Sequence, residues 1–243
     1  MDFQSIFDLN ASELFHMYSS SHVIWIIIFV MMAWMLWRFR HRIRTSTATQ
    51  RVLRYSLIGM LILPEGIRYL WYTVEGYWDI RVHLPLELCS ISLYLSIIML
   101  ITRNYLLYQI MVFAGVGGAM QALLTPNLEY AFPHFIYFHF FICHLAIILA
   151  SLYMTWVEQF RPRLKSIGIT MIFLNILAVV VGTINYILQS NYMFLRHKPN
   201  TASILDWLGP YPYYLLVEEL FALTVFLLLY VFFREKKNVR QSA

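Results

Sequence analysis

The sequence contains a thiol and several imidazoles inside apolar segments, and these side chains could together support covalent chemistry. Cys89 lies one turn beyond Pro85 in VHLPLELCSISLYLSIIMLI, while His134, His139 and His144 recur five residues apart in PHFIYFHFFICHLAIILA. A thiolate can attack an ester carbonyl, and a histidine with an unperturbed pKa of about 6.5 can take and return the proton. Cys89 is therefore a candidate nucleophile for acyl transfer. Alternatively, Cys89 is a small hydrophobic residue that only packs between helices.

The spacing of the histidines argues against a metal site and limits which of them can serve Cys89. Five residues advance an ideal helix by about 500°, so successive histidines are rotated by about 140° and cannot share one face. The cysteines show no CxxC spacing typical of zinc ligands, and we expect no metal and no cofactor. By the helical rise, His144 lies about 10 Å deeper than Cys89, whereas His134 matches its depth better. This difference in depth between Cys89 and His144 disappears if the helix of Cys89 begins near Ile80 and Pro85 kinks that helix.

Polar residues in the other apolar segments could orient this pair or stabilise an oxyanion. The candidates are Glu65, Gln121, His134 and Asn185, because polar and ionisable groups at membrane depth are costly and are functional candidates by default. Glu65 could orient a nearby histidine, or it could form a buried ion pair with Arg68 three residues later in LILPEGIRYLW. For Gln121 the structural alternative is an interhelical hydrogen bond.

The composition indicates a membrane protein. Hydrophobic residues make up 60% of the chain and charged residues 13%, and the mean hydropathy is +0.62, whereas a soluble domain has about 25% charged residues. A membrane-crossing helix needs about 20 mostly apolar residues, and seven such segments predict an all-α polytopic protein with one membrane domain over residues 1–243. The predicted spans are His22–Trp37, Val52–Val74, Leu86–Ile101, Tyr105–Leu124, Pro133–Trp156, Ile167–Leu188 and Tyr213–Phe233.

Basic residues predict the orientation of these spans, because cytoplasmic loops are enriched in Arg and Lys. Six arginines lie in RFRHRIRTSTATQRVLR after the first span, and the tail carries Lys236, Lys237 and Arg240. We therefore expect the N-terminus outside and the C-terminus in the cytoplasm, and no nucleic acid is needed to explain the net charge of +5. The exception is RHKP in the sixth connection. There Arg196 and Lys198 could bind a phospholipid headgroup at the outer surface, or form an ordinary solvated charge pair.

Several motifs, in order along the chain, resemble a known membrane family. LPLELCSISLYLSIIML, GGAMQALLTP, FPHFIYFHFFICH and NYMFLRHKPNTASILDWLGPYPYY are similar to segments of the YwaF-type bacterial integral membrane proteins, which are related to the transmembrane protein 164 family. The resemblance extends from about Ser19 to Phe233. It implies an acyltransferase that moves fatty acyl groups between phospholipids, with Cys89 and His144 as the catalytic residues.

Two positions depart from the pattern of that family. His139 stands where relatives often have Gln, so the resemblance gives it no essential role. Glu87 stands in LPLELCS where the family pattern reads LPLHLCS. An anion two residues from Cys89 disfavours the thiolate and weakens the nucleophile, so the resemblance leaves the activity of this thiol open.

The main functional hypothesis is a membrane-embedded lipid acyltransferase, or acyl-ester hydrolase, that acts at the outer leaflet of a bacterial cell membrane on a phospholipid or another acyl lipid. The first alternative is a non-enzymatic seven-helix carrier or sensor, in which Glu65, Arg68 and the histidines form a proton or ligand pathway. The second alternative is a structural component of an envelope-assembly complex.

Overall fold

The computed structural model describes residues 6–8, 14–198 and 207–235, and within them the chain is helical with no β-strand. The predicted all-α class is therefore confirmed. The basic tail residues Lys236, Lys237 and Arg240 lie outside the described residues. The helices are α2 (Ser20–Arg44), α3 (Thr47–Val74), α4 (Leu88–Thr102), α5 (Tyr105–Ile110), the π-helix η1 (Met111–Gly115), α6 (Val116–Leu124), α7 (Phe135–Trp156), α8 (Leu164–Leu188), the 3-10 helix η2 (Tyr192–Phe194) and α9 (Tyr213–Phe233).

Helices occupy the positions of all predicted spans, and five of them are long and apolar enough to cross a membrane. These five are α2, the continuous α5–η1–α6 segment, α7, α8 and α9. The other two differ for physical reasons: α3 carries the charges of Glu65 and Arg68 within its length, and α4 has only 15 residues. The alternative start of the third helix near Ile80 is wrong, because residues 80–85 form turns and bends and α4 begins at Leu88.

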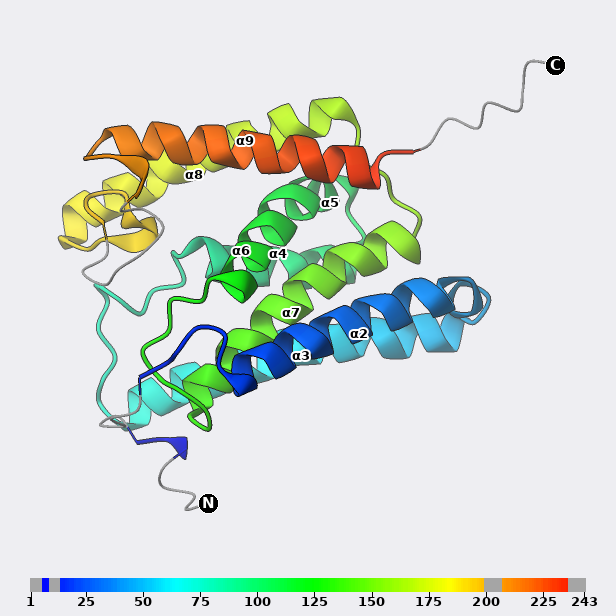
Figure 1. Ribbon diagram of the computed structural model, residues 1–243, viewed down its shortest axis with the longest axis horizontal. Coiled ribbons are helices and arrows are strands. Elements are labelled where there is room, and N and C mark those ends of the chain that lie inside the picture. Colours follow the sequence, from blue (N-terminus) through cyan, green and yellow to red (C-terminus); the bar gives the residue numbers. More distant parts are fainter. Residues whose placement is uncertain (1–5, 9–13, 199–206, 236–243) are drawn as a thin grey trace.

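The central helix of the bundle is α7. It packs against α2, α3, α4, η1 and α6, and Figure 1 shows it crossing between the α2–α3 pair and the group formed by α4, α5 and α6. Its sequence is apolar on nearly all sides, as expected for a helix enclosed by others, and side chains such as Phe141 and Tyr153 are fully buried. Candidate site residues on α7 therefore face neighbouring helices.

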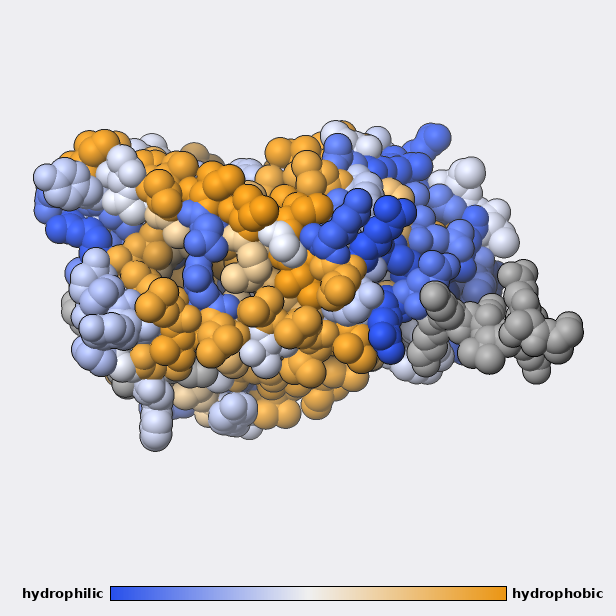
Figure 2. Space-filling model, turned by 90° about the horizontal axis from the view of Figure 1, so that it is seen from above, coloured by the Kyte–Doolittle hydropathy of each residue, from blue (hydrophilic) through white to orange (hydrophobic). Residues whose placement is uncertain are grey.

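The helices α8 and α9 pair with each other beyond α5 and η1, and their outward surface is apolar. Val179 keeps 70% and Leu228 keeps 67% of its surface exposed. Figure 2 shows hydrophobic residues in a broad band across the molecule, with the hydrophilic residues gathered mainly toward the ends. A band of this extent on a water-exposed protein would be an aggregation surface, so the natural environment of these helices is a bilayer.

A π-helix interrupts the most buried part of the fourth predicted span, between α5 and α6. Ser151 of α7 donates a hydrogen bond to the Met111 carbonyl at 3.2 Å, and this bond adds to the one that the same oxygen accepts from the Val116 N–H in the π-helix. Gly117 of α6 faces α9, where a Cβ would make an ordinary van der Waals contact with Val225 at 3.4 Å. The helices α4, α7 and α9 all pack against η1.

Candidate active site

The two cysteines have opposite environments. Both are free, but Cys89 is exposed in the first turn of α4, whereas Cys143 is buried in α7 and keeps 4% of its surface. A lipid or water-borne substrate can reach only a thiol with accessible surface. Of the two thiols, Cys89 is therefore the one positioned for chemistry.

Glu87, which the sequence marked as unfavourable for the thiol, has a structural partner. Its Oε2 accepts a hydrogen bond from the backbone N–H of Met193 at 3.1 Å. Although Glu87 is the N-cap residue of α4, its side chain makes no capping hydrogen bond to that helix. The carboxylate thus connects the start of α4 to the connection that follows α8.

His144 lies well inside α7, keeps 6% of its surface, and has a defined tautomer. Its Nδ1 is 2.7 Å from the carbonyl oxygen of Phe140. Because a carbonyl oxygen can only accept, Nδ1 carries the proton and Nε2 of the neutral ring keeps its lone pair. Nε2 is therefore the nitrogen that can act as a base. The helices of Cys89 and His144 pack against each other, although no hydrogen bond joins these two side chains among the described residues.

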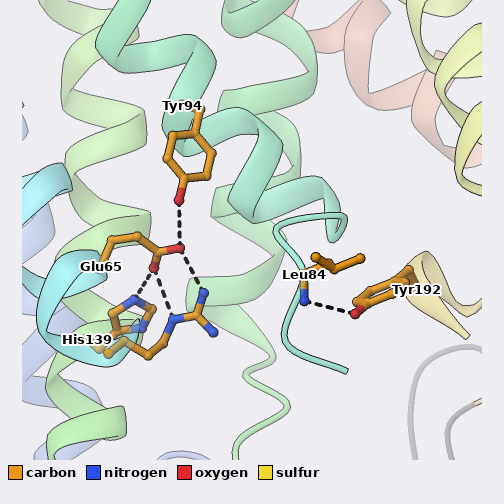
Figure 3. Close-up of polar contacts among 6 residues, drawn as sticks. Glu65, Leu84, Tyr94, His139 and Tyr192 are labelled. Atoms are coloured by element: carbon orange, nitrogen blue, oxygen red, sulfur yellow. Dashed lines mark hydrogen bonds and ion pairs between the residues drawn. The ribbon is translucent and has the colours of Figure 1, made fainter. Parts of the chain in front are cut away.

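The predicted Glu65–Arg68 pair is confirmed, and it belongs to a larger group that we call the Glu65 cluster (Glu65, Arg68, Tyr94 and His139). Arg68 donates from Nε and Nη2 to the two carboxylate oxygens at 3.0 and 2.8 Å, a bidentate geometry. His139 Nε2 donates to Oε2 at 2.7 Å, and the Tyr94 hydroxyl lies 3.5 Å from Oε1. Glu65 keeps only 4% of its surface. The cluster joins α3, α4 and α7 (Figure 3).

The sequence analysis missed the role of His139. Glu65 was expected to orient a histidine, and the histidine that it contacts is His139, not His134 or His144. The Glu65 carboxylate itself indicated that a further partner was needed, because a buried charge needs hydrogen bonds beyond a single ion pair. Tyr94 offered no comparable signal in the sequence.

Arg68 also brings a positive charge into the surroundings of the thiol. It is close enough to Cys89 for the two groups to interact electrostatically. Its guanidinium further lies over the rings of Tyr69 and Tyr72, 4.8 and 5.8 Å from their centroids. Arg68 is thus a candidate for stabilising negative charge during a reaction at Cys89, a role for which the sequence analysis did not single it out.

The other predicted supporting residues have different surroundings. His134 caps α7, because its Nδ1 accepts from the N–H of Ile136 at 3.1 Å. Asn185 is fully buried and binds both the N–H and the carbonyl of Tyr192 at 2.8 Å. Gln121 is exposed near the end of α6. His134 and Asn185 therefore have structural hydrogen bonds, while Gln121 remains available to a ligand.

The connection after α8 is fastened over the start of α4 by Tyr192. The Tyr192 hydroxyl donates to the Ile80 carbonyl at 2.7 Å. It also accepts from the Leu84 N–H at 2.9 Å (Figure 3). Together with the Glu87–Met193 bond, these contacts form what we call the outer latch. The latch fixes the backbone immediately before Cys89.

The two basic residues predicted to bind a headgroup are both partly engaged by the protein. Arg196 donates from Nη2 to the Gln189 side chain at 3.1 Å and from Nη1 to the Ser190 carbonyl at 3.3 Å. The Lys198 ammonium lies 5.7 Å from the centroid of the Tyr214 ring. Headgroup binding by this pair stays a prediction.

Comparison with known proteins agrees with the motifs. No curated protein and no solved structure matches the chain. The model of the TMEM164 family matches residues 17–230, a region that includes α2 to α8, most of α9, Cys89, His144 and the Glu65 cluster. The chain therefore belongs to the TMEM164 family.

Proposed function

We propose that the protein is a membrane-embedded lipid acyltransferase or acyl-ester hydrolase, with Cys89 as nucleophile and His144 as general base. The observation that carries the proposal is the free, exposed thiol of Cys89 on a helix that packs against the helix of His144. Family membership adds support, because the motifs that resemble the family contain both residues. A phospholipid or another acyl lipid is the substrate class.

The reaction has two stages. The Cys89 sulfur attacks the ester carbonyl of the donor lipid while Nε2 of His144 takes the thiol proton, and the tetrahedral intermediate then expels the alcohol, which receives that proton. This leaves an acyl thioester on Cys89. A hydroxyl of an acceptor lipid, or water, attacks the thioester with His144 again as base, and the thiol is regenerated. Arg68 and Gln121 are the donors that we propose for stabilising the oxyanions.

For the membrane topology we propose seven spans, with the N-terminus outside and the C-terminus in the cytoplasm of a bacterial cell. The support is that helices occupy all the predicted positions and that arginines gather where α2 ends and α3 begins and in the α7–α8 connection. Cys89 and the outer latch then lie toward the outer leaflet. Reporter fusions after residues 46 and 162 should report cytoplasmic locations, and an external location for either would reject this orientation.

The test of the enzymatic proposal compares three variants in a fluorescent phospholipid assay. Cys89→Ser and His144→Ala should each abolish the acylated protein intermediate and the turnover of the donor. Cys143→Ser is the matched control, because it changes the buried cysteine next to His144 and should preserve turnover. Undiminished labelling and turnover in the first two variants would eliminate the assignment.

The second candidate function is a proton-coupled carrier or a sensor, and the observation that favours it is the Glu65 cluster. A buried carboxylate shared between an arginine and a histidine inside apolar helices is a common arrangement for moving or sensing protons. Proton-coupled uptake into vesicles that survives Cys89→Ala and is lost in His139→Ala would favour this function over catalysis.

A further inference from the structure

At the end of the bundle opposite the outer latch, two pockets share the same residues. One pocket, of about 450 Å³, lies between the connection 159–163 and the last turn of α9. The other, of about 420 Å³, lies among the ends of α2, α7 and α9. Arg161, Arg234 and Glu235 line both. The end of α9 therefore lies between the two pockets and contributes to the lining of both.

The charges that line the first pocket favour an anion. Arg161 is held in place, because its Nη1 donates to the carbonyls of Thr155 and Phe160. Arg163 and Arg234 are exposed, and neither guanidinium forms an ion pair with a described residue. By contrast, Arg103 at the same end is paired with Glu158 at 3.3 Å. In the first pocket, three arginines against the single carboxylate of Glu235 leave the lining with a net positive charge.

The surroundings of the pockets are apolar and face outward. Leu164, which lines the first pocket, is 61% exposed, and Phe232, which lines the second, is 73% exposed. The ring of Tyr230 completes the wall of the first pocket. A ligand that satisfies both the arginines and this apolar rim has a phosphate group joined to acyl chains, and a water-soluble phosphate would use only the arginines.

We propose that these pockets form a binding site for the phosphodiester headgroup of an anionic phospholipid, separate from Cys89 and from any acyl transfer. Arg161 provides the fixed donor, and Arg163 and Arg234 close on the phosphate oxygens with charge-assisted hydrogen bonds. The acyl chains lie along Leu164 and Phe232. The inference does not rest on the proposed enzymatic function.

The test measures lipid binding to the purified full-length protein in detergent by native mass spectrometry. The probes are phosphatidylglycerol, phosphatidylcholine and, as the soluble competitor, glycerol 3-phosphate. The variant Arg163→Gln/Arg234→Gln removes two lining charges. The matched control, Arg51→Gln/Lys165→Gln, removes two exposed charges at the start of α3 and of α8 that line neither pocket.

We expect the lining variant to weaken phosphatidylglycerol binding about tenfold, as expected from two lost charge-assisted bonds, and the control to change it less than about twofold. Phosphatidylcholine should bind more weakly than phosphatidylglycerol to the wild type. Equal losses in the two double variants would overturn the site. Complete displacement of the lipid by glycerol 3-phosphate would overturn the lipid as its ligand. Circular dichroism of both variants checks that they are folded.

Discussion

At the scale of single residues, Glu87 has two effects that oppose each other. Its bond to Met193 holds the connection over α4, while its charge disfavours the Cys89 thiolate. Glu87→Gln separates them, because the amide oxygen can still accept the bond. Two unit charges about 6 Å apart in water interact by ~0.7 kcal/mol, so we expect the rate of maleimide alkylation of Cys89 to rise about threefold. An unchanged rate would show that the carboxylate does not act on the thiol.

The Glu65 cluster allows a second prediction at this scale. Glu65→Ala leaves Arg68 without its partner, and the Arg68 side chain is only 15% exposed. Removal of one member of a buried pair typically costs about 3–5 kcal/mol, so we expect a large drop in the thermal unfolding temperature in detergent. The double variant Glu65→Ala/Arg68→Met should recover part of the lost thermal unfolding temperature, because it no longer leaves a buried charge unpaired. A double variant that is no more stable than Glu65→Ala would contradict this account of the pair.

At the scale of elements, the outer latch should control the order of the connection 79–86. Tyr192→Phe removes two hydrogen bonds, each worth about 1 kcal/mol, and hydrogen exchange of backbone amides in this connection should become roughly tenfold faster or more. Tyr186→Phe is the matched control, because Tyr186 lies on α8 and is 75% exposed. Equal exchange in the two variants would show that the Tyr192 hydroxyl does not hold the connection.

The same connection contains a pH-sensitive group. Burial lowers the pKa of His83 below its ordinary value of 6.5, and the hydrogen bond with Asp79 only partly opposes this effect. The unfolded chain therefore binds the proton first as the pH falls, and the free energy of unfolding decreases below about pH 6.5 until the folded form is protonated as well. His83→Gln should reduce the loss of thermal stability between pH 6.5 and 5. An identical pH profile in that variant would exclude His83 as the cause.

Helix positions and helix contacts differed in how far the sequence could predict them. Hydropathy located Tyr105–Leu124 and Tyr213–Phe233 at their observed bounds, because span length is set by the bilayer. The Glu65–Arg68 pair followed from the geometry of one helix. The contact of Glu65 with His139 depends on the rotation of α7 against α3, and the π-helix depends on packing around Met111. Neither the identity of the histidine that contacts Glu65 nor the π-helix can be predicted from the residues of a single helix.

At the scale of the whole molecule, the two proposed sites lie at opposite ends of the helix bundle. The exposed thiol, the outer latch and Gln121 lie at one end, and the arginine-lined pockets lie at the other. The Glu65 cluster lies between α3, α4 and α7 and fixes the orientation of the helices that carry Cys89 and His144. We therefore expect acyl transfer and phospholipid binding at the arginines to be separable by mutation.

The central claim is covalent catalysis by Cys89, and intact-protein mass spectrometry tests it most directly. After brief incubation with a phospholipid donor, the wild-type protein should gain the mass of one acyl group. Peptide mapping should place that group on Cys89, and neutral hydroxylamine should remove it as expected for a thioester. Cys143→Ser should acquire the same mass and Cys89→Ser should not. An acyl group on another residue, or turnover of the donor by Cys89→Ser at the wild-type rate, would contradict the account.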